Sequence, residues 1–156
     1  NISASTKTEY NEAVFAHLHN HTQFSVLQST IAIPDLVKAA AKIHTMGPKF
    51  VIIKKGEHGA LLFHDGKIFA IPALPLEEVF DPTGAGDTFA GGFASYLAKK
   101  EDFSFESMKS ALIVGSAMAS FTVEKFGTQR LEEVTESEIV DRINSFKELT
   151  TFEVEV

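Results

Sequence analysis

The stretch VFDPTGAGDTFAGGF, residues Val79 to Phe93, decides what this chain is expected to be. An apolar strand end leads into a turn at residues 81–83, and small residues at 84–86 come just before a helix. The unpaired amides and the macrodipole at a helix N-terminus favour an anion there. A carboxylate at Asp87, beside that anion, is unfavourable unless it has a function. We expect it to accept a proton from a hydroxyl that attacks a phosphoryl group.

The segment DPTGAGDTFAGGF resembles the C-terminal signature of the ribokinase (PfkB) family of carbohydrate and nucleoside kinases. The resemblance implies that the amides of Gly84, Ala85 and Gly86 stabilise the transferring phosphate. It implies that Asp87 is the catalytic base and that Asp81 helps to bind a monovalent cation. The segment is neither a Walker P-loop nor a dinucleotide fingerprint. A glycine-rich turn that only caps a buried helix is the structural alternative, and the length of the match favours the kinase.

Two further turns complete the nucleotide site that this resemblance implies. FVIIK at residues 50–54 has the continuous apolar character of a buried strand and leads into a turn punctuated by glycine. The family likeness places this turn beside the nucleotide phosphates, and the turn after the helix over 105–126 beside adenine. A plain exposed turn and a purely structural core helix are the alternatives. The residues implied near ATP and its Mg²⁺ are Lys54, Gly56, Gly59, Thr83 and Gly127.

Composition limits the class of protein and its partners. The chain has 156 residues, 44% of them hydrophobic, which suits one domain with a real core. Its formal net charge of -7 argues against nonspecific nucleic-acid binding. The absence of cysteine suits a reducing cytoplasm, and no apolar run is long enough to span a membrane. We therefore expect a cytoplasmic protein whose partners are a nucleotide and a sugar or nucleoside.

A second resemblance covers residues 13–41, where three histidines alternate with other residues. Period two puts His17, His19 and His21 on one face of a strand, which is a beginning for a metal site. FAHLHNHTQFSVLQSTIAIPDLVKAAA resembles the start of a PHP domain, as in bacterial DNA polymerase III alpha subunits. That family binds divalent metal through an HxH pair, which His17 and His19 match best. Its other ligands have no room in this chain, so an orphaned strand with exposed histidines is the favoured alternative.

The element pattern predicts an α/β fold: a small, mostly parallel sheet with a β-hairpin, covered by helices. Asp65-Gly66 is a strong hairpin signal, and Thr135 with Glu138 makes a capping box before the last helix. The expected strands are 13–22, 50–54, 60–63, 67–71 and 77–80. The expected helices are 33–46, one from residue 87, 105–126 and one after residue 135, followed by a tail over 150–156 that is an edge strand or loose.

The two resemblances meet inside the helix over 33–46, which indicates a chimera folded as one domain over 1–156. Its segments are a PHP-like 1–41, a kinase-like 42–149 and the tail 150–156. The sugar-binding part of a ribokinase-type enzyme is not represented, so catalysis by the chain alone stays open. The alternatives to ATP-dependent phosphoryl transfer are a catalytically silent chimera or fragment, and a PHP-like phosphoesterase. An open sheet edge also favours pairing as a homodimer.

Overall fold

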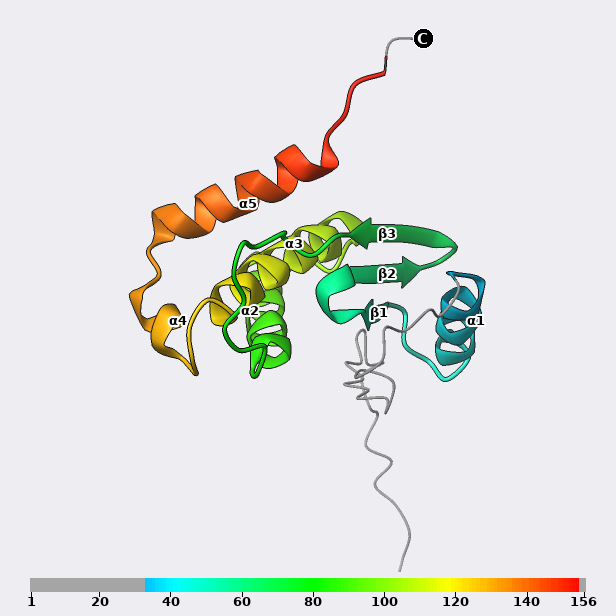
Figure 1. Cartoon of the computed structure of the whole chain (residues 1–156). Helices are drawn as coiled ribbons and strands as arrows, with labels where there is room; N and C mark the ends of the chain where they lie inside the picture. Colours follow the sequence, from blue (N-terminus) through cyan, green and yellow to red (C-terminus); the bar gives the residue numbers. More distant parts are fainter. Residues whose placement is uncertain (1–32, 155–156) are drawn as a thin grey trace, which may run out of the picture.

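The computed structural model describes residues 33–154, which form a three-stranded sheet with helices on both faces (Figure 1). The strands are β1 (Val51–Lys54), β2 (Ala60–His64) and β3 (Lys67–Ile71). A short 3-10 turn, η1 (Gly56–His58), joins β1 to β2. The helices are α1 (Ile33–His44), α2 (Ala85–Lys100), α3 (Phe105–Thr122), α4 (Gln129–Glu133) and α5 (Glu136–Thr150). None of these helices combines the length and apolar character that crossing a bilayer requires.

The three described strands are antiparallel and lie in the order β1-β2-β3. The hairpin predicted across residues 65–66 is confirmed, with His64 paired to Lys67. A mostly parallel sheet is wrong for these strands, because Val51 pairs antiparallel with Phe63. The physical reason is the connection: η1 returns the chain within a few residues, whereas a parallel crossover needs a dozen or more.

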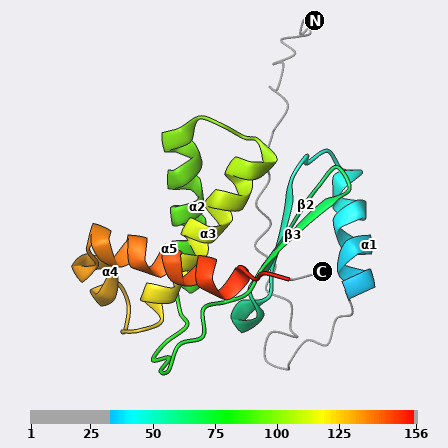
Figure 2. The ribbon, with the colours of Figure 1, turned by 90° about the horizontal axis from the view of Figure 1, so that it is seen from above.

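Strand β2 is buried on both faces, which explains its run of apolar residues. Leu61 and Phe63 pack in a cluster with α1, whereas Ala60 and Leu62 belong to a larger core with α2, α3 and α5. Figure 2 shows α1 and the α2–α3 pair on opposite sides of the strands. A strand that is buried on both faces does not alternate between apolar and polar residues. The continuous apolar pattern is therefore kept although the sheet is antiparallel.

Helices α2 and α3 form most of the larger core and approach each other closely at Gly115. A Cβ at this position would lie 2.7 Å from the carbonyl oxygen of Phe89 and 3.3 Å from Cβ of Phe93. On the core-facing side of α2, Phe89, Phe93 and Leu97 are buried. The close approach fixes α2 rigidly against α3, and α2 carries the signature at its N-terminal end.

Helix ends differ modestly from the predicted ones. Helix α1 ends at His44, two residues before the predicted Met46, and α3 ends at Thr122 in place of residue 126. Helix α4 has no counterpart among the predictions. In the described part of the tail, residues 151–154 contain no strand. The strand expected over 13–22 lies outside the described residues.

The strand expected over residues 77–80 is wrong, because this segment has no regular structure. Two prolines, Pro72 and Pro75, separate it from β3, and each removes a backbone donor that a sheet would need. Instead the N–H of Phe80 donates to the carbonyl of Val123, at 2.8 Å. That bond joins Phe80, which immediately precedes the signature, to the residue that follows α3.

An ionic cluster joins the ends of α3, α4 and α5. Glu124 accepts hydrogen bonds from Arg130 at 2.9 Å and from Arg142 at 2.6 Å. Both guanidinium groups lie over the ring of Phe121, at 4.1 Å for Arg142 and 5.1 Å for Arg130. Arg130 also donates to Glu138 at 2.5 Å. Two arginines and two glutamates are therefore linked to one another beside the buried ring of Phe121.

The capping box predicted for α5 is confirmed, and it makes stability depend on pH in acid. The hydrogen bond from Arg130, and then those from the backbone and hydroxyl of Thr135, lower the pKa of Glu138 from 4.5 to about 2. Between these values the unfolded chain binds more protons than the folded one. Glu138 therefore contributes stability that is complete above pH 4.5 and is lost as the pH falls through about 2.

We expect Glu138→Gln to reduce the acid sensitivity of folding. Urea unfolding followed by circular dichroism at several pH values should show a flatter decline between pH 4.5 and pH 2 than the wild type shows. Glu136→Gln is the control, because Glu136 also lies in the first turn of α5 but is outside the capping box. It should keep the wild-type slope. A wild-type slope in Glu138→Gln as well would contradict the prediction.

Candidate functional site

The signature turn is built by one side-chain hydrogen bond and one glycine. Oδ1 of Asp81 accepts from the N–H of Thr83 at 2.9 Å, and hydrogen bonding by Thr83 lowers the pKa of Asp81. Gly84 follows with φ 83° and ψ -10°, and α2 begins at the next residue. Glycine enters this left-handed conformation without the penalty that a Cβ brings. The order Asp-Pro-Thr-Gly therefore folds locally into the helix start that the sequence predicts.

The backbone amides of this turn are not all equally available. The N–H of Ala85 donates to the carbonyl of Pro82 at 3.2 Å, and the N–H of Asp87 donates to that of Gly84 at 3.1 Å. The N–H of Gly86 has no hydrogen-bond partner among residues 33–154. An unpaired amide in the first turn of a long helix favours a negative group. Of the three amides implied as an anion site, that of Ala85 is already engaged, and that of Gly86 has no partner in the described part of the chain.

Asp87 is exposed in the first turn of α2 and lies at the edge of a mainly apolar depression of about 600 Å³. The depression runs along α2 and is completed by α3, α4 and α5. Its lining is Asp87, Thr88, Gly91, Gly92, Ser95, Tyr96, Lys99, Val114, Met118, Leu131 and Ile139. This depression could not be predicted from the sequence, because four helices contribute to it. Its one local signal is the pair of glycines in α2.

Lys54 reaches the signature from the end of β1. Its Nζ donates to the carbonyl of Gly86 at 3.2 Å and lies 5.3 Å from the centre of the Phe89 ring. Burial lowers the pKa of Lys54, and the nearby charge of Asp87 acts in the opposite direction. The fold therefore brings together three of the residues singled out from the sequence, Lys54, Gly86 and Asp87.

Two of the remaining glycines shape the turn next to Lys54. Gly56 opens η1 with φ 59°. Gly59 closes it with φ 84°, and a Cβ there would lie 2.0 Å from the carbonyl oxygen of Ile71. The N–H of Lys55 donates to the carbonyl of Gly59 at 2.8 Å. This turn is tightly determined by backbone geometry, as expected for a segment that must hold one conformation.

The last two residues implied near the nucleotide lie on the surface. Thr83 is exposed in the signature turn, and Gly127, with φ 60°, lies in the turn between α3 and α4. The hydrogen bond between Phe80 and Val123 brings the end of α3 to the entry of the signature. Gly127 is therefore linked to the signature through the backbone, four residues beyond that bond.

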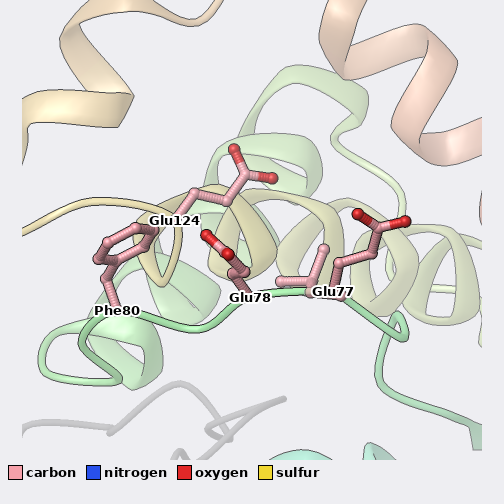
Figure 3. A pocket seen from close by; sticks show the side chains of 5 residues that line it. Glu77, Glu78, Phe80 and Glu124 are labelled. Atoms are coloured by element: carbon pink, nitrogen blue, oxygen red, sulfur yellow. The ribbon is translucent and has the colours of Figure 1, made fainter.

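A second pocket, of about 300 Å³, lies beside the entry to the signature (Figure 3). It is lined by Leu76, Glu77, Glu78, Phe80 and Glu124. Glu124 is neutralised by its two arginines, whereas Glu77 and Glu78 keep this surface acidic, which disfavours a phosphate there. Across the described part of the chain, no group of three or more His, Asp or Glu side chains could hold a metal ion. His17 and His19, implied by the PHP resemblance, lie outside the described residues.

Comparison with known proteins identifies one family over most of the chain. The pfkB family carbohydrate kinase model matches residues 4–135. The chain is 51% identical to a cytidine kinase of Thermococcus kodakarensis over 61 residues, which is 38% of this chain and 22% of that protein. It is 34% identical to a ribokinase of Arabidopsis thaliana over 111 residues, which is 69% of this chain and 28% of that enzyme. The first curated relatives are thus matched over about a quarter of their length.

The family match begins at residue 4 and includes the segment 13–41, so the comparisons do not show the PHP domain or the chimera that the sequence suggests.

Solved structures agree with the family match. Arabidopsis thaliana ribokinase, in complex with ribose and ATP, superposes with a TM-score of 0.60 at 31% identity, covering 73% of this chain and 35% of that one. The ligand-free nucleoside kinase of Burkholderia thailandensis gives a TM-score of 0.54 at 30% identity, covering 65% and 32%. These likenesses confirm the α/β class and the ribokinase-like fold. Together with the match over residues 4–135, they show that the chain belongs to the pfkB family of carbohydrate kinases.

Proposed function

We propose that this chain carries the nucleotide- and phosphate-binding part of an ATP-dependent sugar or nucleoside kinase. The observation that supports it is the first turn of α2, where the N–H of Gly86 has no partner among residues 33–154 and the next residue is the exposed Asp87. An open amide donor and a proton acceptor, side by side at a helix N-terminus, are what phosphoryl transfer to a hydroxyl needs.

In the proposed reaction, the oxygen of the acceptor hydroxyl attacks the γ-phosphorus of ATP, and Asp87 accepts the proton of that hydroxyl. The new oxygen–phosphorus bond forms as the bond to the bridging oxygen breaks, and ADP leaves with that electron pair. The amides of Gly84 and Gly86 stabilise, by hydrogen bonds, the negative charge that develops on the phosphoryl oxygens. The N–H of Ala85 could take part only after its hydrogen bond to the Pro82 carbonyl is broken. Asp87 is exposed, so an acceptor can reach it from solvent.

The nucleotide would lie against the turn at η1, near Lys54, Gly56 and Gly59, with Thr83 and Gly127 at its edges. Mg²⁺, when bound with ATP, neutralises charge on the phosphate oxygens, and it is commonly held by one or two carboxylates together with those oxygens. Asp81 is the acidic residue of the signature turn, which suits the monovalent cation that the family resemblance implies. Its carboxylate is already oriented by Thr83.

The names of the relatives favour a sugar or nucleoside as acceptor, since they include a cytidine kinase, nucleoside kinases and ribokinases. The chain nevertheless spans only 22% to 28% of the first curated relatives. A catalytically silent chain that binds ATP without transferring phosphate is therefore the alternative within the same proposal. The homodimer and the cytoplasmic location stay predictions from the sequence.

A titration of ATP with Mg²⁺ by calorimetry tests the proposal. We expect weak binding that Gly86→Val abolishes, because the branched side chain would cover the open amide. Asp87→Asn should bind almost as the wild type does, since this side chain serves the acceptor and not the nucleotide. Gly91→Val, elsewhere on α2 where a Cβ would meet nothing within 4 Å, is the control and should also bind.

The outcomes separate the alternatives. Wild-type binding, lost only in Gly86→Val, supports the anion site, and an acceptor panel containing ribose and cytidine then tests transfer. Binding without transfer to any acceptor favours the silent chain. No heat from the wild type at high ATP concentration would contradict the proposal. A PHP-type phosphoesterase is not proposed, because the pfkB match includes residues 13–41; zinc or manganese copurifying with the chain would reopen that question.

A further inference from the structure

We infer that Lys54 is a positioning residue that holds the first turn of α2, and with it Asp87, from the sheet side. The inference rests on the proposed function, in which Asp87 is the base. It assigns Lys54 a contact with the protein, in addition to the place near ATP that the family resemblance implies.

Lys54 connects the sheet to the first turn of α2 by a hydrogen bond. Lys54 ends β1, whereas Gly86 lies in the first turn of α2, 32 residues later in the chain. The ammonium donates to the Gly86 carbonyl at 3.2 Å, and the side chain is half-buried over the Phe89 ring. A hydrogen bond with a charged donor is stronger than a neutral one. Lys54 therefore ties the sheet to the residue that immediately precedes Asp87.

Lys54 also interacts with Asp87 through their opposite charges. The N-terminal end of a helix carries partial positive charge, so a lysine is unfavourable there without a compensating anion. Burial also disfavours the charged ammonium and so lowers the pKa of Lys54, whereas the Asp87 carboxylate favours the charged form and raises that pKa. Together with the hydrogen bond to Gly86, this interaction places Lys54 near Asp87, and Asp87 itself remains exposed to an incoming acceptor.

Neighbouring Lys55 shows that this is not a property of any lysine in the turn. The backbone N–H of Lys55 bonds to the carbonyl of Gly59, and its side chain has no hydrogen bond or ion pair among the described residues. Two adjacent lysines therefore offer a matched comparison. The positioning role predicts that only Lys54 affects the signature turn.

The first test measures the pKa of the Lys54 ammonium by NMR of the full chain with labelled lysine. In Asp87→Asn the pKa should fall below its wild-type value, because the charge that raises it is gone. Asp141→Asn, an exposed aspartate on α5, is the control and should leave the Lys54 pKa unchanged. An unchanged Lys54 pKa in Asp87→Asn overturns the inference.

The second test measures hydrogen exchange at the amides of Asp87 and Thr88, which both bond to the Gly84 carbonyl. Lys54→Met should speed their exchange about tenfold, since the turn loses a hydrogen bond from a charged group. Lys54→Arg should restore most of the protection, and Lys55→Met should match the wild type. Wild-type exchange in Lys54→Met overturns the inference, even if that variant loses ATP affinity, because Lys54 would then be only a nucleotide ligand.

Neither test depends on ATP. If the wild type fails to bind ATP but both tests give the expected result, the proposed function fails and the contact between Lys54 and the signature stands. If ATP binds as proposed while both tests fail, the opposite conclusion follows.

Discussion

Gly59→Ala is expected to lower the free energy of unfolding by about 4 kcal/mol or more, at the upper end for a single substitution. The new Cβ would lie 2.0 Å from the carbonyl oxygen of Ile71 and 2.6 Å from the carbonyl carbon of Pro72. These are backbone atoms, so no side chain can rotate away. Gly59 also has φ 84° and ψ -144°, a conformation that is essentially restricted to glycine. Urea unfolding followed by circular dichroism measures the loss.

The matched control is Gly66→Ala, in the hairpin turn between β2 and β3. Gly66 has a comparable φ of 73°, but a Cβ there would meet nothing within 4 Å. It should cost only about 1 kcal/mol, the price of a left-handed alanine. The difference between the two variants reports the collision with β3 together with the strain from the ψ of Gly59. Equal losses in both would show that Gly59 and Ile71 are not in close approach.

The local elements of this fold could be predicted because each is specified by a few neighbouring residues. Asp65 and Gly66 alone fix the β2–β3 hairpin, and Thr135 with Glu138 alone fixes the start of α5. The direction of β1 could not be predicted, because it depends on how η1 turns the chain. The missing strand at 77–80 has the same origin, since Phe80 finds its hydrogen-bond partner at the end of a distant helix.

In the candidate site, too, some features are determined locally and others depend on tertiary packing. The sequence predicts the turn and helix start at Gly84 to Asp87, because Asp81 and Gly84 determine that backbone locally. The contact between Lys54 and Gly86 joins residues 32 apart, and nothing in either segment specifies it. The depression beside Asp87 needs four packed helices, so it exists only in the folded chain. Tertiary packing, not local preference, decides these features.

Phe121→Ala is expected to lower the free energy of unfolding by about 4 kcal/mol. Phe121 is 1% exposed and is among the largest fully buried side chains of the described residues. Its removal leaves a cavity and also takes away the ring that the guanidinium groups of Arg130 and Arg142 lie over. Phe126→Ala, five positions later, is the control, because that ring is 62% exposed. It should change the unfolding free energy by no more than about 0.5 kcal/mol.

Phe121→Leu separates the two contributions of this ring. Leucine keeps much of the apolar volume but offers no aromatic face to the guanidinium groups, which lie 4.1 Å and 5.1 Å from the ring centre. We expect a loss of about 2 kcal/mol, combining modest repacking with the lost cation–π interactions. In an Arg142→Met background the same substitution should cost less, because one of the two cations is already absent. Equal costs in both backgrounds would mean that burial alone makes Phe121 important, and that Arg142 contributes through its hydrogen bonds and not through the ring.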